Sequence, residues 1–251
     1  MKSQESAPKR SITGNVILVS VLLHLAAGSL AGQTNVRFYT EAGEYNVSRG
    51  MYIRSAVIPG LAIKRNLIEA GLETNVYFPS KPAISGFSLR TSKIFTGEKT
   101  KFSIELFWIT NFSSTLLSEK MWGADCKMSR NHFEMTLGIN FDWYSFNRKA
   151  EKLYSIDRDA ATVHETFNAL YSFTYRFRGI DSKWNLGLTI TDYDYFGINQ
   201  ETNPILRIGF NYKVSRHLNL VAEGNYLCAG ITNFAFGYFG FNLKTGVIWN
   251  F

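Results

Sequence analysis

The histidines are the side chains in this sequence best suited to catalysis, because a histidine beside a serine or a carboxylate can act as a general base. Beyond the first thirty residues, these are His132, His164 and His217. None is followed two residues later by serine, and the nucleophile motif Gly-x-Ser-x-Gly does not occur. A serine hydrolase therefore has little support in the sequence.

His164 is the histidine with the most acids in nearby segments. Asp157 and Asp159 precede it in a charge-rich stretch, and Asp192 and Asp194 stand in a later one. Carboxylates beside a histidine could activate water in a protease or bind a divalent cation. Because charged residues in connecting segments are usually just solvated, this is a secondary hypothesis.

Cysteine and metal chemistry have weaker support. Cys126 and Cys228 are too few to form the disulfide framework of a small secreted domain. No Cys-x-x-Cys or His-Glu-x-x-His spacing is present. We expect no cofactor, no metal site and no catalytic residue that the sequence can name, and we expect both thiols to remain unpaired.

The spacing of the charged residues indicates the secondary structure of the segments that contain them. They alternate with apolar residues in several segments, and strict alternation of this kind is typical of β-strands. Such alternating runs lie at 133–143, 167–177, 184–190 and 206–214. The clearest run closes the sequence, where one face carries Phe239, Phe241, Leu243, Thr245, Val247, Trp249 and Phe251.

Composition supports an all-β protein of considerable size. The 251 residues are 45% hydrophobic and 19% charged, which excludes wholesale disorder. The 20 Phe, 13 Tyr and 5 Trp occur with 20 Gly and only 5 Pro, as is typical of strands. A mean hydropathy of −0.09, with no long apolar stretch after the first thirty residues, argues against a polytopic helical membrane protein.

The amino terminus has the three sections of a signal peptide. Lys2, Lys9 and Arg10 precede an apolar run at 16–27, and small residues follow at 29–31. The run is too short to span a bilayer. We predict cleavage after Ala31, which leaves residues 32–251 as one exported domain.

Turn signals divide the exported domain into twelve strands, a number that the pattern fixes to within two. Short connectors at 59–65, 96–99, 129–131, 179–182 and 215–216 alternate with longer loops, of which 147–164 is the longest. This organisation predicts a closed antiparallel transmembrane β-barrel. The predicted strands are 34–41, 50–58, 66–78, 84–95, 100–112, 119–129, 132–146, 165–178, 183–193, 204–214, 217–228 and 237–251.

Residues 34–251 resemble the bacterial outer-membrane β-barrel proteins. The most specific element is the final strand, whose Trp249 and Phe251 look like the signal by which such proteins are recognised for insertion. The resemblance implies a Gram-negative outer membrane, contact with its lipid and lipopolysaccharide, and insertion by the barrel-assembly machinery. A soluble exported β-sandwich or lipocalin-like barrel is the alternative, but it would have to enclose the aromatic residues of all twelve strands.

If the apolar face meets lipid, the opposite face lines the lumen. The charged residues expected on that face include both acids and bases, and such a mixed set predicts either a narrow, porin-like channel or a structural envelope barrel. The alternatives are an outer-membrane hydrolase of lipid or peptide with its site at the extracellular loops, and a non-conducting subunit that contacts an envelope partner through loop 147–164. Basic residues form no stripe, so we expect no nucleic acid. The predicted lumen residues are Glu69, Glu73, Arg90, Glu105, Glu134, Asp142, Arg176, Arg207, Lys213, Glu223 and Lys244.

Overall fold

The computed structural model describes residues 33–45, 50–77, 82–112, 117–146, 162–177, 182–198, 204–229 and 237–251. The predicted signal peptide, 1–31, and Asp157 and Asp159 in the longest predicted loop lie outside the described residues. Among the residues described, no helix is long and apolar enough to cross a membrane.

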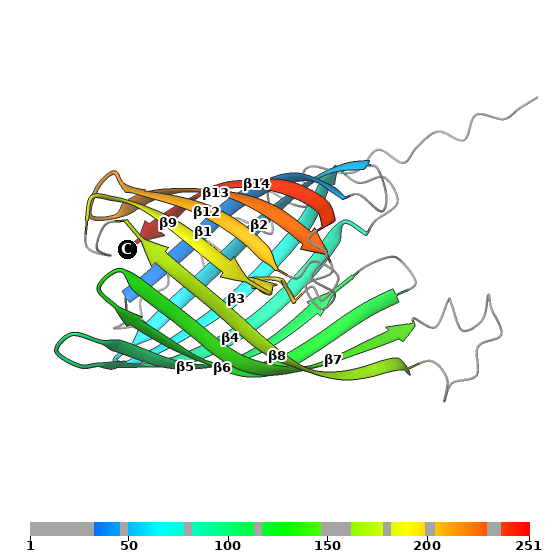
Figure 1. The fold of residues 1–251 in the computed structure, drawn as a ribbon, viewed down its shortest axis with the longest axis horizontal. Coiled ribbons are helices and arrows are strands. Elements are labelled where there is room, and N and C mark those ends of the chain that lie inside the picture. The colour runs from blue at the N-terminus through cyan, green and yellow to red at the C-terminus, as the bar shows by residue number, and fades with distance from the viewer. Residues whose placement is uncertain are drawn as a thin grey trace, which may run out of the picture. The chain divides into compact units, whose positions relative to one another are not determined.

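Twelve antiparallel strands close into a barrel (Figure 1), which confirms the predicted fold class. A separate two-stranded hairpin, β10 and β11, is inserted between β9 and β12. The strands are β1 (Gln33–Tyr45), β2 (Gly50–Ile63), β3 (Asn66–Tyr77), β4 (Ile84–Thr96), β5 (Lys101–Asn111), β6 (Leu117–Arg130), β7 (Phe133–Phe146), β8 (Thr162–Arg176), β9 (Trp184–Thr191), β10 (Tyr193–Asp194), β11 (Gly197–Ile198), β12 (Ile205–Lys213), β13 (Leu218–Ala229) and β14 (Gly237–Asn250).

The first and last strands complete the barrel. Val36 of β1 stands opposite Trp249 of β14, and the Phe251 N–H donates to the Thr34 carbonyl at 2.9 Å. The other side of β1 pairs with β2 along its whole length. Closure therefore pairs the backbone N–H and C=O groups that would otherwise be unpaired at the two sheet edges. A β-sheet surrounded by hydrocarbon requires this pairing, because no water is present to bond to those groups.

The second strand extends beyond its predicted end. The sequence places a connector at 59–65, but β2 continues to Ile63 and leaves only a two-residue turn, in which Lys64 has a φ of 56°. Pro59 misleads the prediction because proline lacks the N–H that a strand ladder needs. Here Pro59 lies opposite Val36 on the β1 side, and the β2–β3 register has a gap at this position, between Val57 and Gly60.

The tight turns gather at the end of the barrel that holds the carboxyl terminus (Figure 1). His217, in the turn between β12 and β13, makes a 2.8 Å hydrogen bond from its ring to the Asn250 carbonyl. His132, in the turn between β6 and β7, makes the same kind of bond to the Arg176 carbonyl. These two rings therefore join each turn to a neighbouring strand.

The exterior of the barrel is a continuous apolar surface edged by aromatic residues. Trp108, Trp122, Phe141 and Phe167 stand opposite one another across β5 to β8, and all four are exposed. A second row near the turns includes Phe133, which is eight positions before Phe141 on β7. With a strand rise of about 3.3 Å and a tilt of about 40°, the two rows are about 20 Å apart along the axis. Such a band suits the hydrocarbon core of a membrane.

Candidate lumen constriction

After β9, the chain turns into the barrel instead of continuing outward. The Thr191 hydroxyl donates to the Tyr171 carbonyl at 3.0 Å, and the Asp192 carboxylate accepts the Tyr171 N–H at 3.0 Å. Burial raises the pKa of Asp192 to about 6. These contacts attach the base of the hairpin to the wall at β8.

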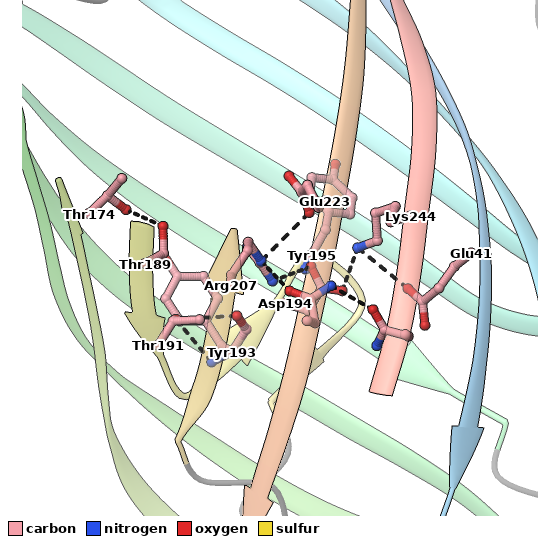
Figure 2. A network of polar contacts seen from close by, with 12 residues as sticks. Glu41, Thr174, Thr189, Thr191, Tyr193, Asp194, Tyr195, Arg207, Glu223 and Lys244 are labelled. Atoms are coloured by element: carbon pink, nitrogen blue, oxygen red, sulfur yellow. Dashed lines mark hydrogen bonds and ion pairs between the residues drawn. The ribbon is translucent and has the colours of Figure 1, made fainter. Parts of the chain in front are cut away.

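The hairpin carboxylate, Asp194, lies between two cations of the wall (Figure 2). Its Oδ2 accepts from Lys244 Nζ at 2.5 Å, and its Oδ1 lies 3.3 Å from Arg207 Nη2. Burial by itself would raise the pKa of Asp194, but Lys244 and then Arg207 hold it below its ordinary value. Asp194 is therefore charged at neutral and mildly acidic pH.

The next residue, Tyr195, is held by two arginines. Its carbonyl accepts from Arg90 Nη2 at 2.6 Å. The Arg90 and Arg37 guanidinium groups lie 4.4 Å and 4.9 Å from the centre of its ring. Burial raises the pKa of Tyr195 to about 12, so the phenol keeps its proton.

Phe196 fills an apolar recess on one wall. It forms a buried cluster with Ala56 and Ile58 of β2. The recess depends on Gly71 of β3, because a Cβ at this position would stand only 2.8 Å from both the Phe196 and Tyr195 rings. Glycine leaves the space that the two aromatic side chains occupy.

Tyr193 packs on a different part of the wall, against Phe107 and Ile109 of β5, Met121 of β6 and Leu170 of β8. Together, the contacts of Tyr193 to Phe196 reach β1, β2, β4, β5, β6, β8, β12 and β14. The hairpin therefore crosses the interior of the barrel from one wall to the other.

Most of the predicted lumen residues lie on the enclosed face of the sheet. Glu69, Glu73, Arg90, Asp142 and Lys244 are buried, and Glu105, Glu134, Arg176, Arg207 and Glu223 are partly buried. Lys213 is exposed, and it is the last residue of β12, beside the turn to β13.

The barrel brings several of the predicted residues together as ion pairs. Arg90 lies 2.5 Å from Glu105, Arg176 lies 3.2 Å from Glu134, and Arg207 lies 3.6 Å from Glu223. Four further wall partners were not among the predicted lumen residues: Arg37 pairs with Glu69, Arg54 with Glu73, Glu41 with Lys244, and Lys127 with Glu134. They belong to β1, β2 and β6, the three strands that the sequence defines least well.

Of the acids expected to group with His164, the structure describes only Asp192 and Asp194. Asp194 pairs with Lys244 and Arg207, and Asp192 bonds to the Tyr171 backbone. The His164 side chain lies outside the described residues. Across the described part of the chain, no cluster of three or more His, Cys, Asp or Glu side chains could hold a metal ion. Cys126 is exposed and Cys228 is buried, and both are free.

Sequence reasoning missed the hairpin, since it treats 194–203 as an exposed loop. One signal is present: Tyr195 and Phe196 are large aromatic residues in a segment expected to face water, directly after Tyr193 at the end of the predicted strand. Aromatic side chains with so much apolar surface are more stable when packed against other groups.

Comparison with known proteins identifies the fold. No protein-family model matches the sequence, and no curated protein matches it. Among solved structures, the KdgM porin in complex with disordered oligogalacturonate is similar at a TM-score of 0.51 and 6% identity, over 86% of this chain and 99% of that one. The NanC porin is similar at a TM-score of 0.52 and 9% identity, over 84% and 98%. At this level of identity, the likeness is one of fold.

The closed barrel, its apolar exterior and these likenesses agree. The chain folds into a closed twelve-stranded antiparallel β-barrel with an apolar exterior, and this fold is similar to that of the KdgM and NanC porins.

Proposed function

We propose that this protein is a narrow outer-membrane channel whose constriction is the hairpin Tyr193–Ile198. The observation that supports the proposal best is the reach of the hairpin across the lumen, from the apolar cluster at Phe107 and Leu170 to the one at Ala56 and Ile58. Between these two clusters, Asp194 of the hairpin forms ion pairs with Arg207 and Lys244. These pairs can break when the hairpin moves away and form again when it returns.

The polar wall favours a channel over a purely structural barrel. Buried ion pairs such as Arg90–Glu105 and Lys244–Glu41 lose much of their hydration, and well-packed apolar groups of similar volume are often at least as stabilising. A barrel that only had to be stable would gain little from such a wall. An aqueous passage needs one, because ions and polar solutes cross only where polar groups replace part of their hydration.

The test is single-channel recording of the refolded protein in planar bilayers. Replacement of Tyr193–Phe196 by Gly-Ser-Gly-Ser keeps the loop length and removes the four side chains that hold the hairpin across the lumen, while Thr191 and Asp192 still attach its base. We expect larger conductance steps than in the unmodified barrel. A matched control replaces Glu98 and Lys99, in the turn between β4 and β5, by Gly-Ser and should leave the steps unchanged.

Two outcomes would contradict the proposal. Equal conductance in the unmodified and hairpin-replaced barrels would mean that the hairpin does not limit the passage. Silence from both, with folding verified by heat-modifiable migration on a gel, would mean that the barrel is structural or is a non-conducting subunit of an envelope complex.

A further inference from the structure

The wall groups around Asp194 are arranged to hold an anion. Arg207 and Lys244 each contact a wall acid, but each is closer to the hairpin carboxylate. Arg207 lies 3.3 Å from Asp194 and 3.6 Å from Glu223. Lys244 lies 2.5 Å from Asp194 and 3.5 Å from Glu41. The shorter contact of both cations is therefore made to a group that the barrel wall itself does not supply.

Both cations also contact wall groups outside the hairpin: Lys244 lies 3.5 Å from Glu41, and its Nζ lies 4.8 Å from the centre of the Tyr39 ring. Arg207 Nε donates to Asn225 Oδ1 at 2.6 Å, and Asn225 Nδ2 donates to Asn242 Oδ1 at 2.6 Å. Asn225 and Asn242 are buried and belong to β13 and β14. This network stays in place if the hairpin leaves, so the anion position is pre-organised.

We propose that Lys244 and Arg207 form a binding site for a solute carboxylate, and that Asp194 occupies this site as an internal competitor. The proposal rests on the proposed channel function and adds the chemical class of the solute. A solute carboxylate and Asp194 cannot use the same donors together, so binding of the solute favours displacement of the hairpin. Recognition of the solute is then coupled to opening.

The geometry selects a carboxylate over other anions. Oδ1 of Asp194 faces Arg207 and Oδ2 faces Lys244, so each oxygen of one planar group has its own cation. A halide offers a single centre and cannot make both contacts. Glu41 and Glu223 flank the site and would repel an anion of higher charge, such as a phosphate dianion (Figure 2).

The test follows hairpin displacement by thiol labelling, with acetate as the probe. Ser88 of β4 is fully buried, and its hydroxyl converges with Tyr195 and Phe196 on the space above Gly71. In a chain carrying Cys126→Ala and Cys228→Ala, the Ser88→Cys variant provides a thiol that the hairpin covers. A cationic methanethiosulfonate labels it without competing for the anion site. We expect acetate to raise the labelling rate several-fold over chloride at equal ionic strength, with saturation.

Three variants make the result specific. Asp194→Asn removes the competitor, so labelling should be fast in both salts. Glu41→Gln with Lys244→Gln removes a cation without leaving an unpaired acid, and should abolish the acetate effect. Ser103→Cys, on β5, provides a control thiol whose labelling rate should not depend on the salt.

Equal labelling of the Ser88→Cys variant in acetate and chloride would overturn the carboxylate site, as would a full acetate effect in the Glu41→Gln/Lys244→Gln variant. The proposed channel function fails separately. If the hairpin-replaced barrel does not conduct while labelling still responds to acetate, the site stands and the channel does not. If that barrel conducts and labelling ignores acetate, only the site is refuted.

Discussion

Asp194→Asn is the change that most directly tests the hairpin as a constriction, because it removes one charge and keeps the side-chain size. The Asp194 side chain is 30% exposed, and its partner Lys244 is 7% exposed. A surface ion pair contributes at most about 1 kcal/mol, and breaking a fully buried pair costs about 3–5 kcal/mol. The partly buried contacts of Asp194 lie between these limits, at about 2 kcal/mol. Since about 1.4 kcal/mol is a factor of ten, the displaced hairpin should become roughly 30-fold more populated.

The assay is the open fraction of single channels at fixed salt and voltage. Glu223→Gln is the matched control, because it removes a carboxylate from the same Arg207, but one that belongs to the wall and lies 3.6 Å away. We expect a large rise in open fraction for Asp194→Asn and less than a twofold change for Glu223→Gln. The reasoning is refuted if Asp194→Asn behaves like the unmodified protein, or if both variants open equally.

Three further predictions concern the hairpin recess, the base of the hairpin and the last strand. Gly71→Val should displace the Tyr195 and Phe196 rings and raise conductance, whereas Gly209→Val should not, since a Cβ at Gly209 meets nothing within 4 Å. The pKa of Asp192, raised to about 6 from 3.8, means that the folded barrel binds this proton more tightly than the unfolded chain; its contribution to stability should therefore fall as pH rises from about 4 to 6 and level off above. Thermal unfolding of Asp192→Asn should show a shallower fall over that range. Trp249→Ala with Phe251→Ala, at positions that are 45% and 52% exposed, should reduce the amount of barrel inserted in cells but leave refolding in detergent unchanged; equal loss in both assays would mean that these residues act through stability.

Much of the wall follows from local sequence. Alternation has a period of two residues, so a segment that places Phe133 and Phe141 toward lipid must place Glu134 and Asp142 toward the interior. Lipid-facing aromatic residues and interior charges are therefore assigned together, without knowledge of any other strand. The assignment is weakest near Pro59, where the composition resembles a turn and the pairing with β1 and β3 decides the structure.

The constriction could not be predicted in this way because its contacts join distant parts of the sequence. Tyr195 bonds to Arg90, which is 105 positions away, and Asp194 bonds to Lys244, which is 50 positions away. Local patterning shows Asp194 only as a charged residue between two strands, where solvation is the usual outcome. The sequence by itself determined most of the strands and their two faces. Closure of the barrel decided the position of the hairpin. It brings basic side chains of β1, β4, β12 and β14 around residues 193–196, so that these residues are more stable inside the barrel than in water.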